Sequence, residues 1–148
     1  MTSLGVVASA GLLSGALDIS ATSLLVRTQG VPLKRLLQGI ASGALGASAF
    51  KGGKKTAATG LLFHFVIAFA AASVFYGFSR KLPILLDRPF FSGLFYGIAV
   101  HLLMSRIVVP LSAAPKREFS AKAFPIQLVI HIFCVGLPIS FTVSHFSR

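Results

Sequence analysis

One apolar stretch constrains this chain more than any other feature. The run GLLFHFVIAFAAASVFYGF, residues 60–78, contains one side chain that can be charged near neutral pH, His64. With the preceding residues 56–59 it makes about 23 residues, or roughly 34 Å of helix, whereas the hydrocarbon core of a bilayer is about 30 Å thick. A soluble domain of 148 residues does not need so long a buried helix. The stretch therefore predicts a helix that crosses a membrane.

Similar apolar runs recur from one end of the chain to the other. Together they predict an all-α integral membrane four-helix bundle that forms a single transmembrane domain over residues 1–148, with spans at about 4–26, 56–78, 90–109 and 125–143. A shorter run, residues 36–50, is rich in glycine and has about 15 residues, too few for an untilted crossing. We expect it to form an additional short Gly-rich interfacial or re-entrant helix, with a fifth span as the alternative.

The charge composition agrees with a membrane location. The chain is 55% hydrophobic and 11% charged, whereas soluble domains carry about 25% charged residues. Its 14 Lys and Arg residues greatly outnumber three acidic ones. Nearly all the basic residues fall between or after the apolar runs, as in loops that meet lipid headgroups. The lipid bilayer is therefore the predicted partner, and nucleic acid is not.

Basic residues also predict an orientation. Residues 27–55 and 111–124 hold six and three Lys or Arg, whereas residues 79–89 and the C-terminal tail hold three and one. Nine against four places the first and third loops in the cytoplasm and both termini outside. A five-span arrangement would divide the same charges almost evenly. The N-terminus lacks the basic region of a secretory signal, so we expect it to be retained as the first helix.

Ionisable residues inside the predicted spans form the most specific pattern. Counted from the membrane face of the first and third loops, four of them lie about six to eight residues deep, or roughly 9–12 Å. Such groups are costly in lipid and normally face the interior of a bundle. The sequence therefore predicts an internal polar layer of Asp18, His64, His101 and His131, with Arg106 nearby and the Gly-rich segment covering it.

Two pairs of glycines predict close helix packing. Gly11 and Gly15 share one face of the first span, and Gly93 and Gly97 share one face of the third. Small residues four apart let helix backbones approach within a chain or between chains. The lone Cys134 lies in an apolar run, so no disulfide within the chain is possible.

The sequence leaves several functions open. It contains no G-x-S-x-G, H-E-x-x-H or P-loop motif, so we expect no enzyme and no metal site. A non-catalytic structural or accessory subunit of a larger membrane complex, or a self-associating bundle, is favoured. The alternative is a small proton- or ion-linked transporter or channel that uses the Asp/His layer. No cofactor is predicted, although paired membrane histidines could also hold haem or another tetrapyrrole.

Several segments resemble a known family. They are ALDI around Asp18, LLQGIASGALG from Leu36, GLLFHFVIAF from Gly60, FYGIAV from Phe95 and VVPLSAAP from Val108. As a set, they resemble an uncharacterised family of small multi-pass bacterial inner-membrane proteins without an assigned activity. The resemblance covers most of the chain up to about Pro115, and the tail from Lys116, with His131, is less similar. It implies a bacterial origin, a location in the cytoplasmic membrane and a multi-pass bundle.

Overall fold

The computed structural model describes residues 1–116 and 120–147, and this part of the chain is helical without a strand. The elements are α1 (Ser3–Thr28), α2 (Leu33–Leu45), η1 (Gly46–Lys51), α3 (Gly53–Ser79), α4 (Ile84–Asp87), α5 (Pro89–Leu103), η2 (Met104–Val108), α6 (Val109–Leu111), α7 (Ala123–Ile130), η3 (His131–Gly136) and α8 (Leu137–Phe146). α5, η2 and α6 are continuous, and we call them together the third long helix. α7, η3 and α8 are also continuous, and we call them the C-terminal helix.

Four helices in the described part of the chain are long and apolar enough to cross a membrane. They are Ser3–Thr28, Gly53–Ser79, Pro89–Leu111 and Ala123–Phe146. Each overlaps one predicted span and extends beyond it at both ends. The protein is therefore an all-helical, multi-pass membrane protein. Arg117 and Arg148, which enter the predicted orientation, lie outside the described residues.

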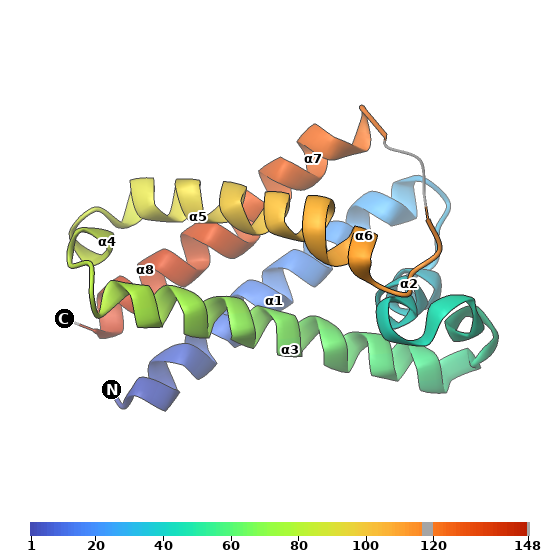
Figure 1. The fold of residues 1–148 in the computed structure, drawn as a ribbon, viewed down its shortest axis with the longest axis horizontal. Coiled ribbons are helices and arrows are strands. Elements are labelled where there is room, and N and C mark those ends of the chain that lie inside the picture. Colours follow the sequence, from blue (N-terminus) through green and yellow to red (C-terminus); the bar gives the residue numbers. More distant parts are fainter. Residues whose placement is uncertain (117–119, 148) are drawn as a thin grey trace.

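The long helices pack in a definite order. α1 lies between α3 and the C-terminal helix, which in turn packs against the third long helix (Figure 1). Both termini lie at the same end of the molecule as α4. A core of buried apolar side chains fills this end, and it consists of Val6, Ala10, Ala72, Phe75, Val135, Ile139 and Val143.

Backbones touch where the third long helix meets the C-terminal helix. A Cβ atom added at Gly136 would overlap the carbonyl oxygen of Gly93, and one at Gly97 would lie 2.6 Å from the Cα atom of Ile132. Only glycine fits so close an approach.

Two π-helical segments interrupt the α-helices shortly before a proline. η2 precedes Pro110 and η3 precedes Pro138. A prolyl ring has no N–H and clashes with the carbonyl of the preceding turn, and a wider π turn relieves that clash. The sequence predicts that Pro110 closes the third span after Val109, but the helix continues through Pro110 to Leu111.

The Gly-rich segment differs from the single helix predicted over residues 36–50. α2 begins earlier, at Leu33, and ends where Gly46 adopts a φ of 61°. This left-handed conformation stops an α-helix, and the 3₁₀ helix η1 follows. In Figure 1, α2 is seen nearly end-on, crosswise to the long helices. Its buried side chains, Leu37, Gln38, Ala41 and Ser42, belong to one face.

Contacts with α3 hold α2 in place. The side-chain amide of Gln38 donates to the carbonyl oxygen of Gly53 at 3.1 Å. A Cβ at Gly60 would overlap the carbonyl oxygen of Leu37, so the two helices approach backbone to backbone.

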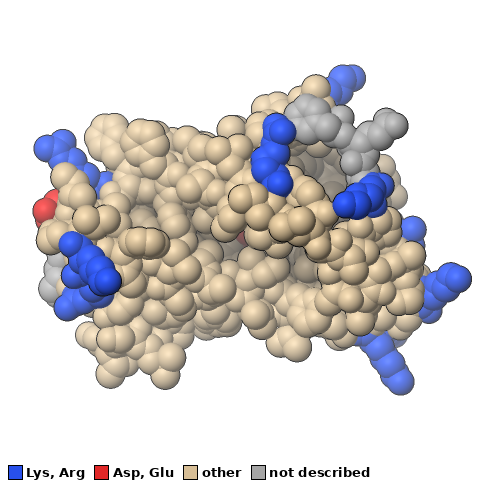
Figure 2. Space-filling view, in the orientation of Figure 1, with Lys and Arg blue, Asp and Glu red and all other residues tan. Residues whose placement is uncertain are grey.

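Most charges lie toward the two ends of the long helices. Figure 2 shows Lys and Arg side chains at both ends of the molecule, one such side chain near the middle, and a broad uncharged band on this face. Many large apolar side chains in this band are exposed, Leu24 and Phe95 by two thirds of their surface. An uncharged band with exposed apolar side chains is what a lipid-facing surface requires.

Candidate functional site

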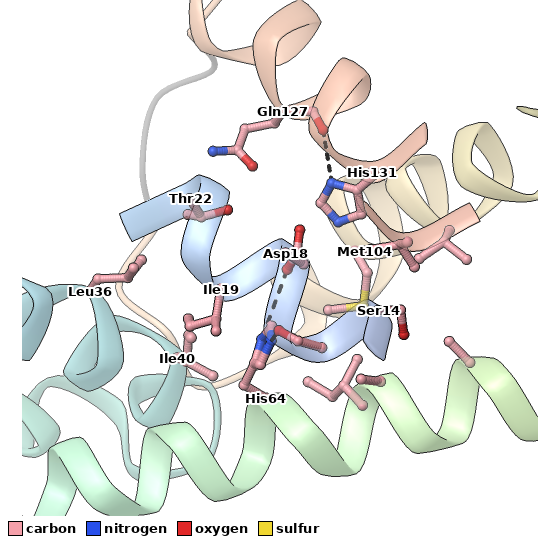
Figure 3. Close-up of a pocket in the computed structure, with 16 residues that line it drawn as sticks. Ser14, Asp18, Ile19, Thr22, Leu36, Ile40, His64, Met104, Gln127 and His131 are labelled. Carbon is pink, nitrogen blue, oxygen red and sulfur yellow. Dashed lines mark hydrogen bonds and ion pairs between the residues drawn. The ribbon is translucent and has the colours of Figure 1, made fainter. Parts of the chain in front are cut away.

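A partly open cavity lies among the helices of the bundle; its lining is mostly apolar, and we call it the polar cavity after the few polar side chains that face it. It has a volume of about 190 Å³ and is bordered by α1, α2, α3, the third long helix and the C-terminal helix (Figure 3). Its polar lining consists of Ser14, Asp18, Thr22, His64, Gln127 and His131. Leu36 and Ile40 of α2 form part of its wall. Three of the four residues in the predicted polar layer therefore line one space.

Asp18 and His64 face each other from neighbouring helices. An oxygen of the Asp18 carboxylate lies 3.9 Å from Nδ1 of His64, and the two side chains are 16% and 12% exposed. At the other side of its ring, His64 Nε2 lies 2.8 Å from the carbonyl oxygen of Gly15. A carbonyl oxygen can only accept, so Nε2 is the donor in this bond. The ring therefore connects α3 to α1 through both of its nitrogens.

His131 lies across the cavity from this pair. Its Nδ1 donates to the carbonyl oxygen of Gln127, one turn earlier, at 2.8 Å. In Figure 3 its ring and the Asp18 carboxylate point toward the same space from opposite helices. Asp18 therefore has a histidine on either side.

His101 does not line the cavity, but its ring contacts the ring of His131, which does. It is 4% exposed, and its ring centroid is 5.0 Å from that of His131 and 4.7 Å from that of Phe124. Within the described residues, neither His101 Nε2 nor Asp18 Oδ1 has a hydrogen-bond partner, although both atoms are buried. Buried polar atoms normally have a partner, so these two atoms depart from the usual pattern.

Other predicted residues lie apart from the cavity. Arg106 is exposed, with its guanidinium carbon 5.4 Å from the centroid of the Phe124 ring. Cys134 is half-buried and does not line the cavity.

The four predicted packing glycines are all buried. Gly11 lies against Phe69, Gly15 against Phe65, and Gly93 and Gly97 against the C-terminal helix. Each therefore lies against another helix of its own chain.

The predicted polar layer left out part of the cavity lining. Thr22 lies one turn after Asp18 and Gln127 one turn before His131, so the spacing i, i+4 places each on the same helix face as a predicted member. Ser14 is one turn before Asp18 on the same face. Met104 borders the cavity from a π-helical segment, and no sequence signal marks it.

His101 and His131 are in direct edge-to-face contact, at 5.0 Å and 62°, so these two rings leave no space for a macrocycle between them. The cavity is also smaller than the roughly 300–1,000 Å³ typical of pockets for larger organic ligands. A tetrapyrrole held by membrane histidines stays a prediction from the sequence. In the part of the chain that the structure describes, no group of three His, Cys, Asp or Glu side chains is placed to hold a metal ion.

The functional assignment depends on this geometry. No protein-family model, curated protein or solved structure matches the chain. The resemblance to bacterial inner-membrane proteins stays a prediction from the sequence.

Proposed function

We propose that this membrane protein moves protons, as a small proton-linked transporter or channel. The observation that carries the proposal is the pairing of Asp18 with His64 in a polar cavity among membrane-spanning helices. Ionisable side chains are costly at this depth, and where they occur they commonly mark ion and proton pathways.

The hydrogen bonds of His64 determine which atom exchanges a proton. Its Nε2 keeps a hydrogen because it donates to the carbonyl of Gly15. Nδ1, which faces Asp18, is therefore the nitrogen that gains or loses a proton. When Nδ1 is protonated, an ionised Asp18 neutralises it, and when Nδ1 is bare, the carboxyl group can hold the proton instead. The pair thus keeps one proton without leaving a net charge in the membrane.

His131 supplies a second acceptor. Its Nδ1 hydrogen is held by the carbonyl of Gln127, so Nε2 is the nitrogen that takes up a proton. Oδ2 of Asp18 faces His64, whereas Oδ1 has no partner among the described residues, and the carboxylate and the His131 ring point toward the same space in Figure 3, so the carboxylate can accept from either histidine. His101 extends the series beyond His131. A proton can therefore pass among groups on four helices.

The end of the bundle that carries the termini is closed. The apolar core that includes Val6, Phe75 and Ile139 fills it. Passage of a proton across the membrane therefore needs this core to open. The π-helical segments η2 and η3 are places where a helix can change its winding, as π turns at functional sites often do.

The role of an accessory subunit has less support from the geometry. In the sequence, association with a partner helix is suggested by the two pairs of glycines on the first and third spans. In the structure, Gly11, Gly15, Gly93 and Gly97 lie against helices of their own chain. These positions are therefore not open to a partner helix. A structural or accessory role, or self-association, stays a prediction, and the proton-linked function is our first proposal.

We also propose the bacterial cytoplasmic membrane as the location, with both termini outside. Among the described residues, the helix ends and connections at the end opposite the termini hold Arg27, Lys34, Arg35, Lys51, Lys54, Lys55, Lys116 and Lys122. The connection at the end with the termini holds Arg80, Lys81 and Arg88. The more basic end is the one expected in the cytoplasm. There α2 would be an interfacial helix that covers the cavity with Leu36 and Ile40.

Proton flux into liposomes tests the proposed function directly. The purified protein is reconstituted around a trapped pH-sensitive dye, and flux is driven in one arm by a potassium diffusion potential and in the other by a sodium gradient. We expect Asp18→Asn and His64→Gln to lower the flux about 100-fold, the scale of a lost proton-transfer group. Glutamine can still donate to the carbonyl of Gly15 but cannot titrate.

Asp87→Asn and His145→Gln are the matched controls, since both side chains are exposed and lie outside the cavity. They should leave the flux unchanged. The proposal is wrong if the native protein shows no more flux than Asp18→Asn in both arms, or if the controls lower the flux equally.

A further inference from the structure

A second, apolar groove lies on the surface of the bundle, at the end that carries the termini. It has a volume of about 600 Å³ and is formed by α3, α4, α5 and their connections. Large exposed side chains form its walls: Phe78, Leu82, Ile84, Phe91 and Phe95 are exposed by about half to two thirds. Tyr96 separates the groove from the polar cavity, because its hydroxyl donates to the carbonyl oxygen of Ala71 at 2.6 Å and its ring packs on Phe75.

The length of the groove matches one membrane leaflet. Along α5 its lining runs from Arg88, at the helix N-terminus, to Ala99. At 1.5 Å per residue this is roughly 16 Å, or about half of the 30 Å hydrocarbon core. A single acyl chain that descends from the headgroup region would occupy this length.

Positive charge lies at the headgroup end of the groove. Arg88 is part of the lining, and Arg80 and Lys81 lie in the same connection between α3 and α5. Asp87, the acidic neighbour of Arg88, is exposed and does not line the groove. A guanidinium binds phosphate oxygens in a two-pronged geometry, and basic side chains at this depth attract anionic lipids.

We propose that the groove between α3, α4 and α5 binds an anionic phospholipid, with one acyl chain along Phe78, Phe91 and Phe95 and the phosphate at Arg88. The wall of aromatic side chains orders the chain, and Arg88 selects the headgroup. The site is independent of the proton-linked function, since it shares no lining residue with the polar cavity.

Fluorescence quenching tests the site, because the chain has no tryptophan. Phe95→Trp places the only indole in the groove, and Phe141→Trp places one on another exposed part of the helix bundle as the matched control. Each variant is reconstituted in phosphatidylcholine vesicles to which a small fraction of brominated lipid is added. The brominated lipid is phosphatidylglycerol in one series and phosphatidylcholine in the other. We expect brominated phosphatidylglycerol to quench the Phe95→Trp variant at an about fivefold lower mole fraction than brominated phosphatidylcholine.

Adding Arg88→Gln should abolish this preference, whereas adding Lys54→Gln, at the other end of the molecule, should leave it unchanged. The proposal is overturned if both lipids quench the Phe95→Trp variant equally, if the preference survives Arg88→Gln, or if the Phe141→Trp variant shows the same preference.

Discussion

His64 joins two helices through opposite sides of one ring: Nδ1 lies 3.9 Å from the Asp18 carboxylate, and Nε2 lies 2.8 Å from the carbonyl oxygen of Gly15. Asp18 and Gly15 are neighbours on one face of α1, so both contacts hold the same stretch of that helix. The ring thus has a hydrogen bond to the backbone on one nitrogen and faces a carboxylate with the other.

The first prediction concerns the hydrogen on each imidazole. Since a carbonyl oxygen can only accept, neutral His64 should carry its hydrogen on Nε2 and neutral His131 on Nδ1. Nitrogen NMR of protein labelled with ¹⁵N-histidine distinguishes the two tautomers by chemical shift, and His64→Gln and His131→Gln assign the signals. The opposite tautomer at either residue would contradict the geometry on which the proton pathway depends.

The second prediction concerns the stability of the Asp18–His64 pair. His64→Leu removes the bond to Gly15 and leaves a mostly buried carboxyl group without its partner, so we expect unfolding free energy to fall by about 1–3 kcal/mol. Asp18→Leu combined with His64→Leu should lower it by less than the sum of the two single changes, because no orphaned charge remains. The unfolding free energies of the native protein, the two single variants and the double variant are measured in mild detergent. If the losses in unfolding free energy simply add, the two side chains are not coupled.

Part of the lining of the polar cavity could be predicted from the sequence, because the rise per residue of a helix is regular. Counting residues from the span ends placed Asp18, His64, His101 and His131 at one depth; three of them line one cavity, and His101 contacts the His131 ring. Arg106 was expected nearby, and it lies exposed against the Phe124 ring, which packs on His101. Met104 lines the cavity from the π-helical segment η2, whose wider turn no periodicity in the sequence reveals.

The position of α2 could not be predicted for a different reason. Its start and end follow from local signals such as Pro32 and Gly46, but its docking depends on contacts with α3 that are remote in the chain. Gly60 appears in the sequence as one more residue of an apolar run. Only the structure shows that its missing side chain leaves room for the backbone of Leu37.

The third prediction follows from that contact. Gly60→Ala should destabilise the docked α2 by about 1–3 kcal/mol, because the added Cβ overlaps the carbonyl oxygen of Leu37 and the backbones must separate. Gly77→Ala is the matched control on the same helix, where nothing lies within 4 Å, and it should stabilise α3 by about 0.5–1 kcal/mol. Thermal unfolding and amide hydrogen exchange in α2 measure both variants. Equal effects at the two glycines would contradict the close approach.

The fourth prediction tests the orientation with cysteines. Cys134→Ala removes the only thiol, and Lys54→Cys or Lys81→Cys then places one at the α2 end or at the end with the termini. Both lysines are exposed, so access to a reagent depends on which side of the membrane they occupy. Because the more basic end is expected in the cytoplasm, a membrane-impermeant maleimide should label the Lys81→Cys variant in intact bacterial spheroplasts and the Lys54→Cys variant only after permeabilisation. The reverse pattern would place the termini in the cytoplasm, and the cavity wall formed by α2 would then face outward.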